Sequence, residues 1–211
     1  MPGRTLPTTR LCLVTPEVPS AGFVAAFEAA ISAGDVASAI VAPRGDGTAD
    51  EDLARKLAPL ALRRGCALVL AGDGDTATRL DGAHVDTGLA GLRAAVARHH
   101  PYRIVGAGGV QTRHDAMDSG EAGADYLFFG RLDGDDLPGI FPKALELAAW
   151  WAELFEIPAM VMGGSAVDSV VEASAAGIEF VALRRAIWDH PDGAAVAVVA
   201  ANRLLAAPRT L

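Results

Sequence analysis

The feature that most constrains the fold of this chain is a regular alternation of short, continuous apolar runs with longer segments of helical period. Continuous apolar runs are typical of strands buried on both faces, as in a parallel sheet covered by helices. Parallel neighbours need crossover connections, and the segments between the runs are long enough to supply them. Strands are expected at residues 11–15, 36–42, 66–71, 83–85, 103–105, 126–129, 159–162 and 180–183.

The connecting segments carry helix signals of their own. Phe23, Phe27 and Ile31 are spaced to share one helical face, and Gly34 is placed to end that helix. The pattern therefore alternates strand and helix along the chain. Helices are expected over 20–33, 49–64, 88–98, 112–121, 140–155, 166–175 and 193–206, with a short helical piece after residue 71.

Eight strand-then-helix units without a hairpin predict a single-domain α/β fold, the (β/α)8 or TIM barrel. The barrel is expected over residues 11–207, preceded by an N-terminal extension over residues 1–10. The main alternative is an open, doubly wound sheet. No G-x-G-x-x-G motif follows the first strand, which counts against that alternative.

Composition excludes several classes of partner. The chain has 26 acidic and 18 basic side chains among its 211 residues, a net charge of −8, so binding to nucleic acid is not expected. No apolar run approaches the roughly 20 residues that span a bilayer, and no signal peptide is recognisable. A cytoplasmic protein without a membrane partner is therefore expected. Cys12 and Cys66 lie in apolar runs and predict buried thiols.

Active sites of parallel barrels gather at the carboxyl ends of the strands. The residues that follow the expected strands are therefore the first candidates for chemistry. They are Thr15, Arg44, Asp73, Asp86, the glycine-rich turn expected over 106–109, Arg131, Gly163 with Gly164, and Arg184 with Arg185.

A phosphate site is expected after the last two strands. Gly163 and Gly164 follow the seventh strand and open a helix, whose N-terminus offers free N–H groups to an anion. Arg184 or Arg185, after the eighth strand, would add a cation. The glycine-rich turn over 106–109 is either a second place of close ligand approach or a plain tight turn.

Aspartates near the middle strands are candidates for a magnesium site. Mg²⁺ prefers oxygen ligands, and Asp73, Asp75 and Asp86 could supply them, although Asp73 to Asp75 could equally be a solvent loop. His84 lies in a short apolar strand, where it is either a core histidine or a group facing substrate.

Five segments, in this order, resemble the thiamine phosphate synthase and thiazole tautomerase superfamily, and the resemblance spans residues 11 to about 205. They are LCLVT at 11–15, DGAHV at 81–85, EAGADY at 121–126, MGG at 162–164 and GIEFVAL at 177–183. The resemblance implies a (β/α)8 barrel. It also implies an Mg²⁺-dependent transferase that joins a hydroxymethylpyrimidine diphosphate to a thiazole phosphate and releases diphosphate.

The same resemblance assigns roles to residues of this chain. Arg44 and Arg131 would hold the diphosphate, and Asp73 with Asp86 would hold Mg²⁺. The remaining residues would bind substrate. They are His84, Gly109 and, for the thiazole phosphate, Gly163, Gly164 and Arg184.

The chain departs from the family pattern at several positions. Ala42 and Asp46 stand where the family's diphosphate motif has glutamine and lysine. The position of the family's second metal aspartate falls near Leu89 in this sequence, and Asp86 is the possible replacement. The family serine after strand five falls near Gly109. The loop after strand six has Arg131 and then three aspartates in place of the lysine, an acidic setting that is unfavourable for a diphosphate without metal. Arg131 also replaces the tautomerase histidine.

These departures leave two alternatives open. One is a non-catalytic paralogue that binds a phosphorylated metabolite or a partner protein. The other is a phosphosugar isomerase or an aldolase-like lyase, although Lys56 and Lys143 lie on or near expected helices, not at strand ends. The helix over 140–155, with Trp150 and Trp151, is a candidate contact for a homodimer or an ordinary packing element.

Overall fold

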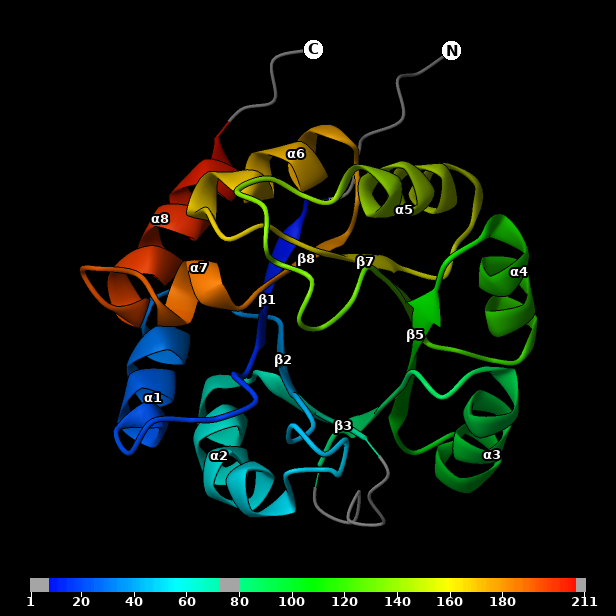
Figure 1. Cartoon of the computed structure of the whole chain (residues 1–211), viewed down its shortest axis with the longest axis horizontal. Coiled ribbons are helices and arrows are strands. Elements are labelled where there is room, and N and C mark those ends of the chain that lie inside the picture. The colour runs from blue at the N-terminus through cyan, green and yellow to red at the C-terminus, as the bar shows by residue number, and fades with distance from the viewer. Residues whose placement is uncertain (1–7, 73–79, 208–211) are drawn as a thin grey trace.

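The computed structural model describes residues 8–72 and 80–207, and in this part of the chain eight parallel strands form a closed barrel (Figure 1). The strands follow one another around the barrel in chain order, and the last pairs with the first. The single-domain (β/α)8 barrel is confirmed. The strands are β1 (Arg10–Val14), β2 (Ser38–Val41), β3 (Ala67–Ala71), β4 (Gly82–Val85), β5 (Ile104–Val110), β6 (Tyr126–Phe129), β7 (Ala159–Met162) and β8 (Phe180–Leu183).

Helices form the outer ring around the strands (Figure 1). The short helical piece expected after residue 71 falls on residues outside the described part. The helices are α1 (Phe23–Ala33), α2 (Glu51–Arg64), α3 (Leu89–His99), α4 (Arg113–Glu121), α5 (Pro142–Leu154), the 3₁₀ turn η2 (Val167–Ser169), α6 (Val170–Ala175), α7 (Arg185–Trp188) and α8 (Ala194–Ala206).

Both faces of the barrel sheet are buried, as continuous apolar strands require. On β1, Leu11 and Leu13 belong to the core between strands and helices, whereas Cys12 and Val14 belong to the core inside the barrel. Cys12 and Cys66 are free and buried, as expected. Because side chains alternate along a strand, one apolar run fills two separate cores.

The barrel is closed by contacts between the two ends of the chain. Arg10 pairs in register with Phe180, and the Thr9 hydroxyl donates to the Ile178 carbonyl at 2.7 Å. The Trp188 indole N–H donates to the Val14 carbonyl at 2.6 Å. Helices α1 and α8 lie side by side outside this seam (Figure 1).

The glycine-rich turn expected over 106–109 is wrong, because these residues belong to strand β5. A Cβ on Gly106 would collide with the Tyr126 ring, and one on Gly108 would lie 2.6 Å from His84 Nε2. Of these glycines only Gly109 has a positive φ, at 69°. The first two glycines therefore serve to admit side chains from β4 and β6.

The expected helix over 140–155 corresponds to α5, and its two tryptophans differ in setting. Trp151 is 1% exposed and donates its indole N–H to the Ile157 carbonyl at 2.7 Å. Trp150 is partly buried, with the Arg113 guanidinium 4.9 Å from its ring centroid. Both contacts are packing within the chain. Among the described helices, none is long and apolar enough to cross a membrane.

Candidate functional site

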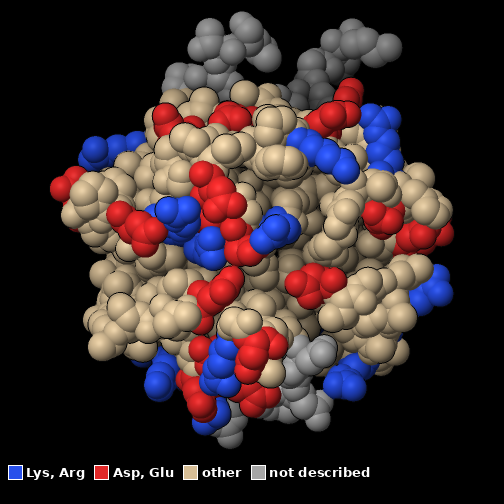
Figure 2. Space-filling model, in the orientation of Figure 1, with Lys and Arg blue, Asp and Glu red and all other residues tan. Residues whose placement is uncertain are grey.

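Loops at the carboxyl ends of the strands surround a cavity of about 290 Å³ at the mouth of the barrel. Five of the predicted site residues line it and so come together from the ends of four strands, β4, β5, β6 and β8. They are His84, Asp86, Gly109, Arg131 and Arg184. Glu17 and Asp133 also line this mouth cavity, so its charge is mixed. Figure 2 likewise shows acidic and basic side chains interleaved near the centre of the face that it draws.

His84 lies at the floor of the mouth cavity, held by an aromatic partner from β6. Its Nδ1 is 2.9 Å from the Tyr126 hydroxyl, and its ring meets Phe128 edge-on, with centroids 5.2 Å apart. His84 is only 2% exposed, and this burial lowers its pKa to about 4. A neutral imidazole at pH 7 can orient a ligand by hydrogen bonding but supplies no positive charge.

Asp86 is the described member of the predicted metal pair, since Asp73 falls outside the described residues. The Asp86 carboxylate lines the mouth cavity, and no described residue forms an ion pair or hydrogen bond with it. No group of three or more metal-ligating side chains occurs in the described residues. Mg²⁺ often takes one or two carboxylates together with substrate phosphates, so an unpaired Asp86 fits this role.

Arg131 follows β6 and is the most exposed cation at the mouth. Its guanidinium pairs with Asp133, with Nε 2.8 Å from Oδ1, and this pairing lowers the pKa of the Asp133 carboxyl. The Arg131 side chain is 77% exposed. Exposed ion pairs of this kind contribute little free energy, so Arg131 is available to exchange Asp133 for an anionic ligand.

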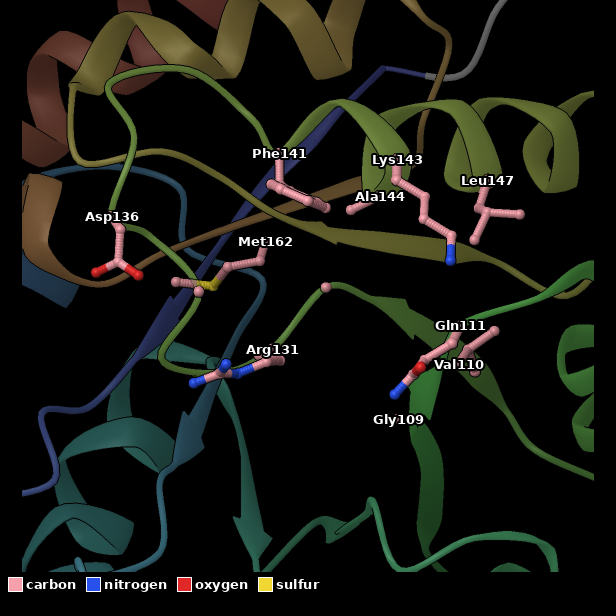
Figure 3. A pocket seen from close by; sticks show the side chains of 12 residues that line it. Gly109, Val110, Gln111, Arg131, Asp136, Phe141, Lys143, Ala144, Leu147 and Met162 are labelled. Atoms are coloured by element: carbon pink, nitrogen blue, oxygen red, sulfur yellow. The ribbon is translucent and has the colours of Figure 1, made fainter.

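A second cavity, of about 320 Å³, adjoins the mouth between β5, β6, β7 and α5. Figure 3 shows Lys143 from α5, Gln111 from the end of β5 and Arg131 around its opening. Its other labelled neighbours include Leu147 and Met162, which are apolar and buried. From the sequence, Lys143 was weighed only as a Schiff-base lysine and Gln111 was not predicted, because no motif marks either residue.

The backbone at Gly163 and Gly164 follows β7 as expected, but its donors are engaged within the chain. The Gly163 N–H donates to the Ala182 carbonyl at 2.8 Å, and the Gly164 N–H donates to Ser169 Oγ at 3.0 Å. A Cβ on Gly164 would collide with the Pro138 carbonyl. The backbone that approaches Gly164 closely is therefore the chain's own loop after β6.

Arg184 follows β8 and forms a largely buried ion pair with Asp135. Its Nε lies 3.1 Å from Asp135 Oδ1, and its Nη2 donates to the same oxygen and to the Asp133 carbonyl. Asp135 is fully buried, and the Arg184 side chain is 15% exposed. This pairing raises the Arg184 pKa against the opposing effect of burial. From the sequence, Asp135 was expected only as one of three aspartates in the loop after strand six.

Arg44 lies on the loop after β2, directly after Ala42 and Pro43, which line the mouth cavity, but Arg44 is not among the lining residues. Its Nη2 is 2.8 Å from Asp50 Oδ1 and 3.5 Å from Asp52 Oδ2. Asp50 also caps α2 by accepting the Leu53 N–H at 3.2 Å. The structure therefore brings Arg131 and Arg184 to the mouth but ties Arg44 to the start of a helix.

Comparison with known proteins agrees with this geometry. A sequence model of the family described as thiamine monophosphate synthase matches residues 11–187. The thiamine-phosphate synthase of Hyphomonas neptunium is 34% identical over 94% of both chains. That of Rhodospirillum centenum is 36% identical over 93% of this chain and 97% of its own.

Solved structures support the fold. A thiamine phosphate pyrophosphorylase from Pyrococcus furiosus superimposes with a TM-score of 0.73, at 21% identity, over 94% of this chain and 96% of its own. A thiamine phosphate pyrophosphorylase from Bacteroides thetaiotaomicron gives a TM-score of 0.61 at 16% identity over 93% of this chain and 95% of its own.

Proposed function

Because this chain belongs to the thiamine monophosphate synthase family, we propose that it joins hydroxymethylpyrimidine diphosphate to a thiazole phosphate and releases diphosphate. The observation that carries the proposal is the convergence of His84, Asp86, Arg131 and Arg184 around one cavity at the barrel mouth. Cations for phosphates and an unpaired carboxylate for a metal ion occur there together.

In this proposal Arg131 binds the diphosphate from the loop after β6, and Arg44 binds it from the loop after β2. Asp86, with Asp73, would hold Mg²⁺, and a bound Mg²⁺ would neutralise charge on the diphosphate. The acid-rich setting of Arg131 is what makes a bound cation necessary, because Asp133 and Glu17 line the same cavity and repel an unscreened diphosphate.

The other predicted residues bind the two rings and the second phosphate. Neutral His84 and the backbone of Gly109 lie at the floor of the mouth, where a heteroaromatic ring would stack and accept a hydrogen bond. Gly163, Gly164 and Arg184, at the ends of β7 and β8, would receive the thiazole phosphate in exchange for the partners that they have within the chain. Two phosphorylated substrates would thus meet across the mouth cavity.

The chemistry asks the protein mainly for charge stabilisation and positioning. The bond from the pyrimidine methylene carbon to the diphosphate oxygen breaks, and the electron pair leaves with the diphosphate. The thiazole nitrogen then gives its lone pair to the resulting carbocation and forms the new C–N bond. Arg131 stabilises the departing anion, and His84 orients a ring without adding positive charge beside the cation.

A direct assay tests this proposal. Purified protein receives both substrates with Mg²⁺, and diphosphate release is measured. Arg131→Ala is expected to lower kcat/KM about 100-fold, in line with the loss of one charge-stabilising donor, and Arg44→Ala tests the second arginine separately. The control is Arg55→Ala, because Arg55 is exposed and, among the residues that the structure describes, its ion-pair partner is Asp52.

The second candidate function is a non-catalytic paralogue that binds a phosphorylated metabolite. The pairing of Arg131 with Asp133 and of Arg184 with Asp135 favours it, since both mouth arginines already have counterions. No diphosphate release from the unaltered protein, together with retained binding of thiazole phosphate by calorimetry, would support the paralogue and contradict synthase activity.

A further inference from the structure

The Asp135 carboxylate uses the same donors that a phosphate after β8 would need. One oxygen accepts from the Arg184 guanidinium, and the other accepts the Arg185 backbone N–H at 2.8 Å. Asp135 has no exposed surface. Both carboxylate oxygens are thus satisfied by groups at the end of β8, and an anion already occupies this position.

The segment 133–139, which carries Asp135, also accepts hydrogen bonds from the backbone N–H groups that follow β7. The Ser165 N–H donates to the Leu137 carbonyl at 2.7 Å, and the Ala166 N–H donates to the Pro138 carbonyl at 3.2 Å. The Pro138 carbonyl also covers Gly164. Together with the internal bonds of Gly163 and Gly164, every backbone N–H from 163 to 166 has a partner within the chain.

We propose that Asp135 is a specificity-determining residue, whose carboxylate holds the acceptor-phosphate position and penalises a phosphorylated acceptor relative to an unphosphorylated one. The inference rests on the proposed function, since it concerns the second substrate of that reaction. We expect a phosphorylated thiazole to displace Asp135 on reaching Arg184, because this guanidinium already faces Asp135 and, at 3.9 Å, Glu17, and both carboxylates would repel a further anion beside it. A thiazole alcohol leaves the ion pair intact.

The displacement has a definite structural cost. Moving the segment 133–139 breaks the bonds of Asp135 to Arg184 and Arg185 and frees the N–H groups of Ser165 and Ala166. The incoming phosphate oxygens replace these partners. The preference between phosphorylated and unphosphorylated thiazole therefore depends on how much more strongly these donors bind phosphate than the Asp135 carboxylate. Replacing Asp135 by an uncharged residue of the same shape weakens the competing ligand directly.

The experiment compares kcat/KM for thiazole phosphate and for thiazole alcohol in the unaltered protein and in Asp135→Asn. Asparagine keeps the shape and an acceptor oxygen but removes the charge. The ratio of kcat/KM, phosphate over alcohol, is expected to rise at least tenfold in Asp135→Asn. The control is Asp136→Asn, which removes a charge from the same segment at an 82% exposed side chain. Ratios within twofold of each other in all three proteins overturn the proposal.

A binding measurement separates this inference from the proposed function. Calorimetry with inorganic phosphate needs no turnover, and Asp135→Asn is expected to bind phosphate at least tenfold more tightly than the unaltered protein. Equal affinities contradict the role of Asp135 even if the condensation assay succeeds. Tighter binding supports it even if the condensation assay fails.

A second variant covers the case in which Asp135→Asn does not fold. Leu137 is 47% exposed and lies in the segment 133–139, so Leu137→Cys can carry an environment-sensitive fluorophore without disturbing the core. Thiazole phosphate is expected to change the fluorescence, and thiazole alcohol is not. Binding of thiazole phosphate by calorimetry without a fluorescence change overturns the displacement.

Discussion

At the scale of single residues, two glycines of β5 make room for an aromatic pair inside the barrel. Gly106 faces the Tyr126 ring and Gly108 faces His84 Nε2. The two rings lie with centroids 5.9 Å apart. Because side chains alternate along a strand, both glycines point inward. The absence of a side chain at these positions fixes where the histidine sits beneath the mouth cavity.

Gly106→Ala is expected to destabilise the fold by about 2–3 kcal/mol, because an added methyl group has to displace a fully packed ring. The measurement is the midpoint of urea unfolding. Gly45→Ala is the matched control, since a Cβ at Gly45 meets nothing within 4 Å. Equal midpoints for the two variants would contradict the packing role of Gly106.

The sequence predicted several site residues but not the residues that contact them. Asp86, Arg131 and Arg184 were expected at the mouth because strand order dictates which residues follow each strand, whereas the roles of His84 and Gly109 came from the family resemblance. Their partners were not predictable. Tyr126 lies 42 positions from His84, and Asp135 lies 49 positions from Arg184, and neither spacing carries a local signal.

At the scale of elements, local capping chemistry sets where α4 begins. The Thr112 hydroxyl accepts the Asp115 N–H at 3.1 Å, and Asp115 accepts the Thr112 N–H at 2.9 Å. This reciprocal arrangement is a capping box, and it lowers the pKa of the Asp115 carboxyl. It starts α4 at Arg113, with two residues between the end of β5 and the helix, which keeps Gln111 beside the second cavity.

Thr112→Ala is expected to lower the free energy of unfolding by about 1 kcal/mol, the usual loss for an N-cap hydroxyl. Chemical unfolding followed by circular dichroism measures it. Gln111→Ala serves as the control, because its exposed side chain caps no helix. A loss at Thr112 no greater than that at Gln111 would show that the capping box is not stabilising.

The apolar runs predicted the elements well except where small residues were involved. Strand β5 extends to Val110, five residues beyond the expected end at 105, because its glycines read as a turn. Helix α7 was missed because its four residues show no helical period. The alternation of strands and helices was sufficient to predict the barrel, because few topologies accommodate eight such units.

At the scale of the whole molecule, the two cores are sealed from solvent and hold the two thiols. Cys12 lies inside the barrel and is 0% exposed, whereas Cys66 lies between strands and helices and is 3% exposed. Burial raises the pKa of both thiols to about 12. Few thiolates form in the folded protein, so reaction with a disulfide reagent requires opening of the barrel.

Both native thiols are therefore expected to react at pH 8 about 1,000-fold more slowly than in urea-unfolded protein, as followed by absorbance with an aromatic disulfide. Val18→Cys is the control, because Val18 is 84% exposed and a cysteine there is expected to react at once. Fast reaction of Cys12 in the folded protein would contradict a sealed barrel.

The seam between β1 and β8 has a consequence for synthesis on the ribosome. Strand β1 leaves the exit tunnel first but cannot form its pairing with β8 until β8 has also been synthesised, because Arg10 pairs with Phe180 and the Val14 carbonyl accepts a hydrogen bond from Trp188. Until translation is nearly finished, the nascent chain therefore has an unclosed sheet with two unpaired edge strands. A premature stop codon before β8 would yield a chain that aggregates rather than a smaller working enzyme.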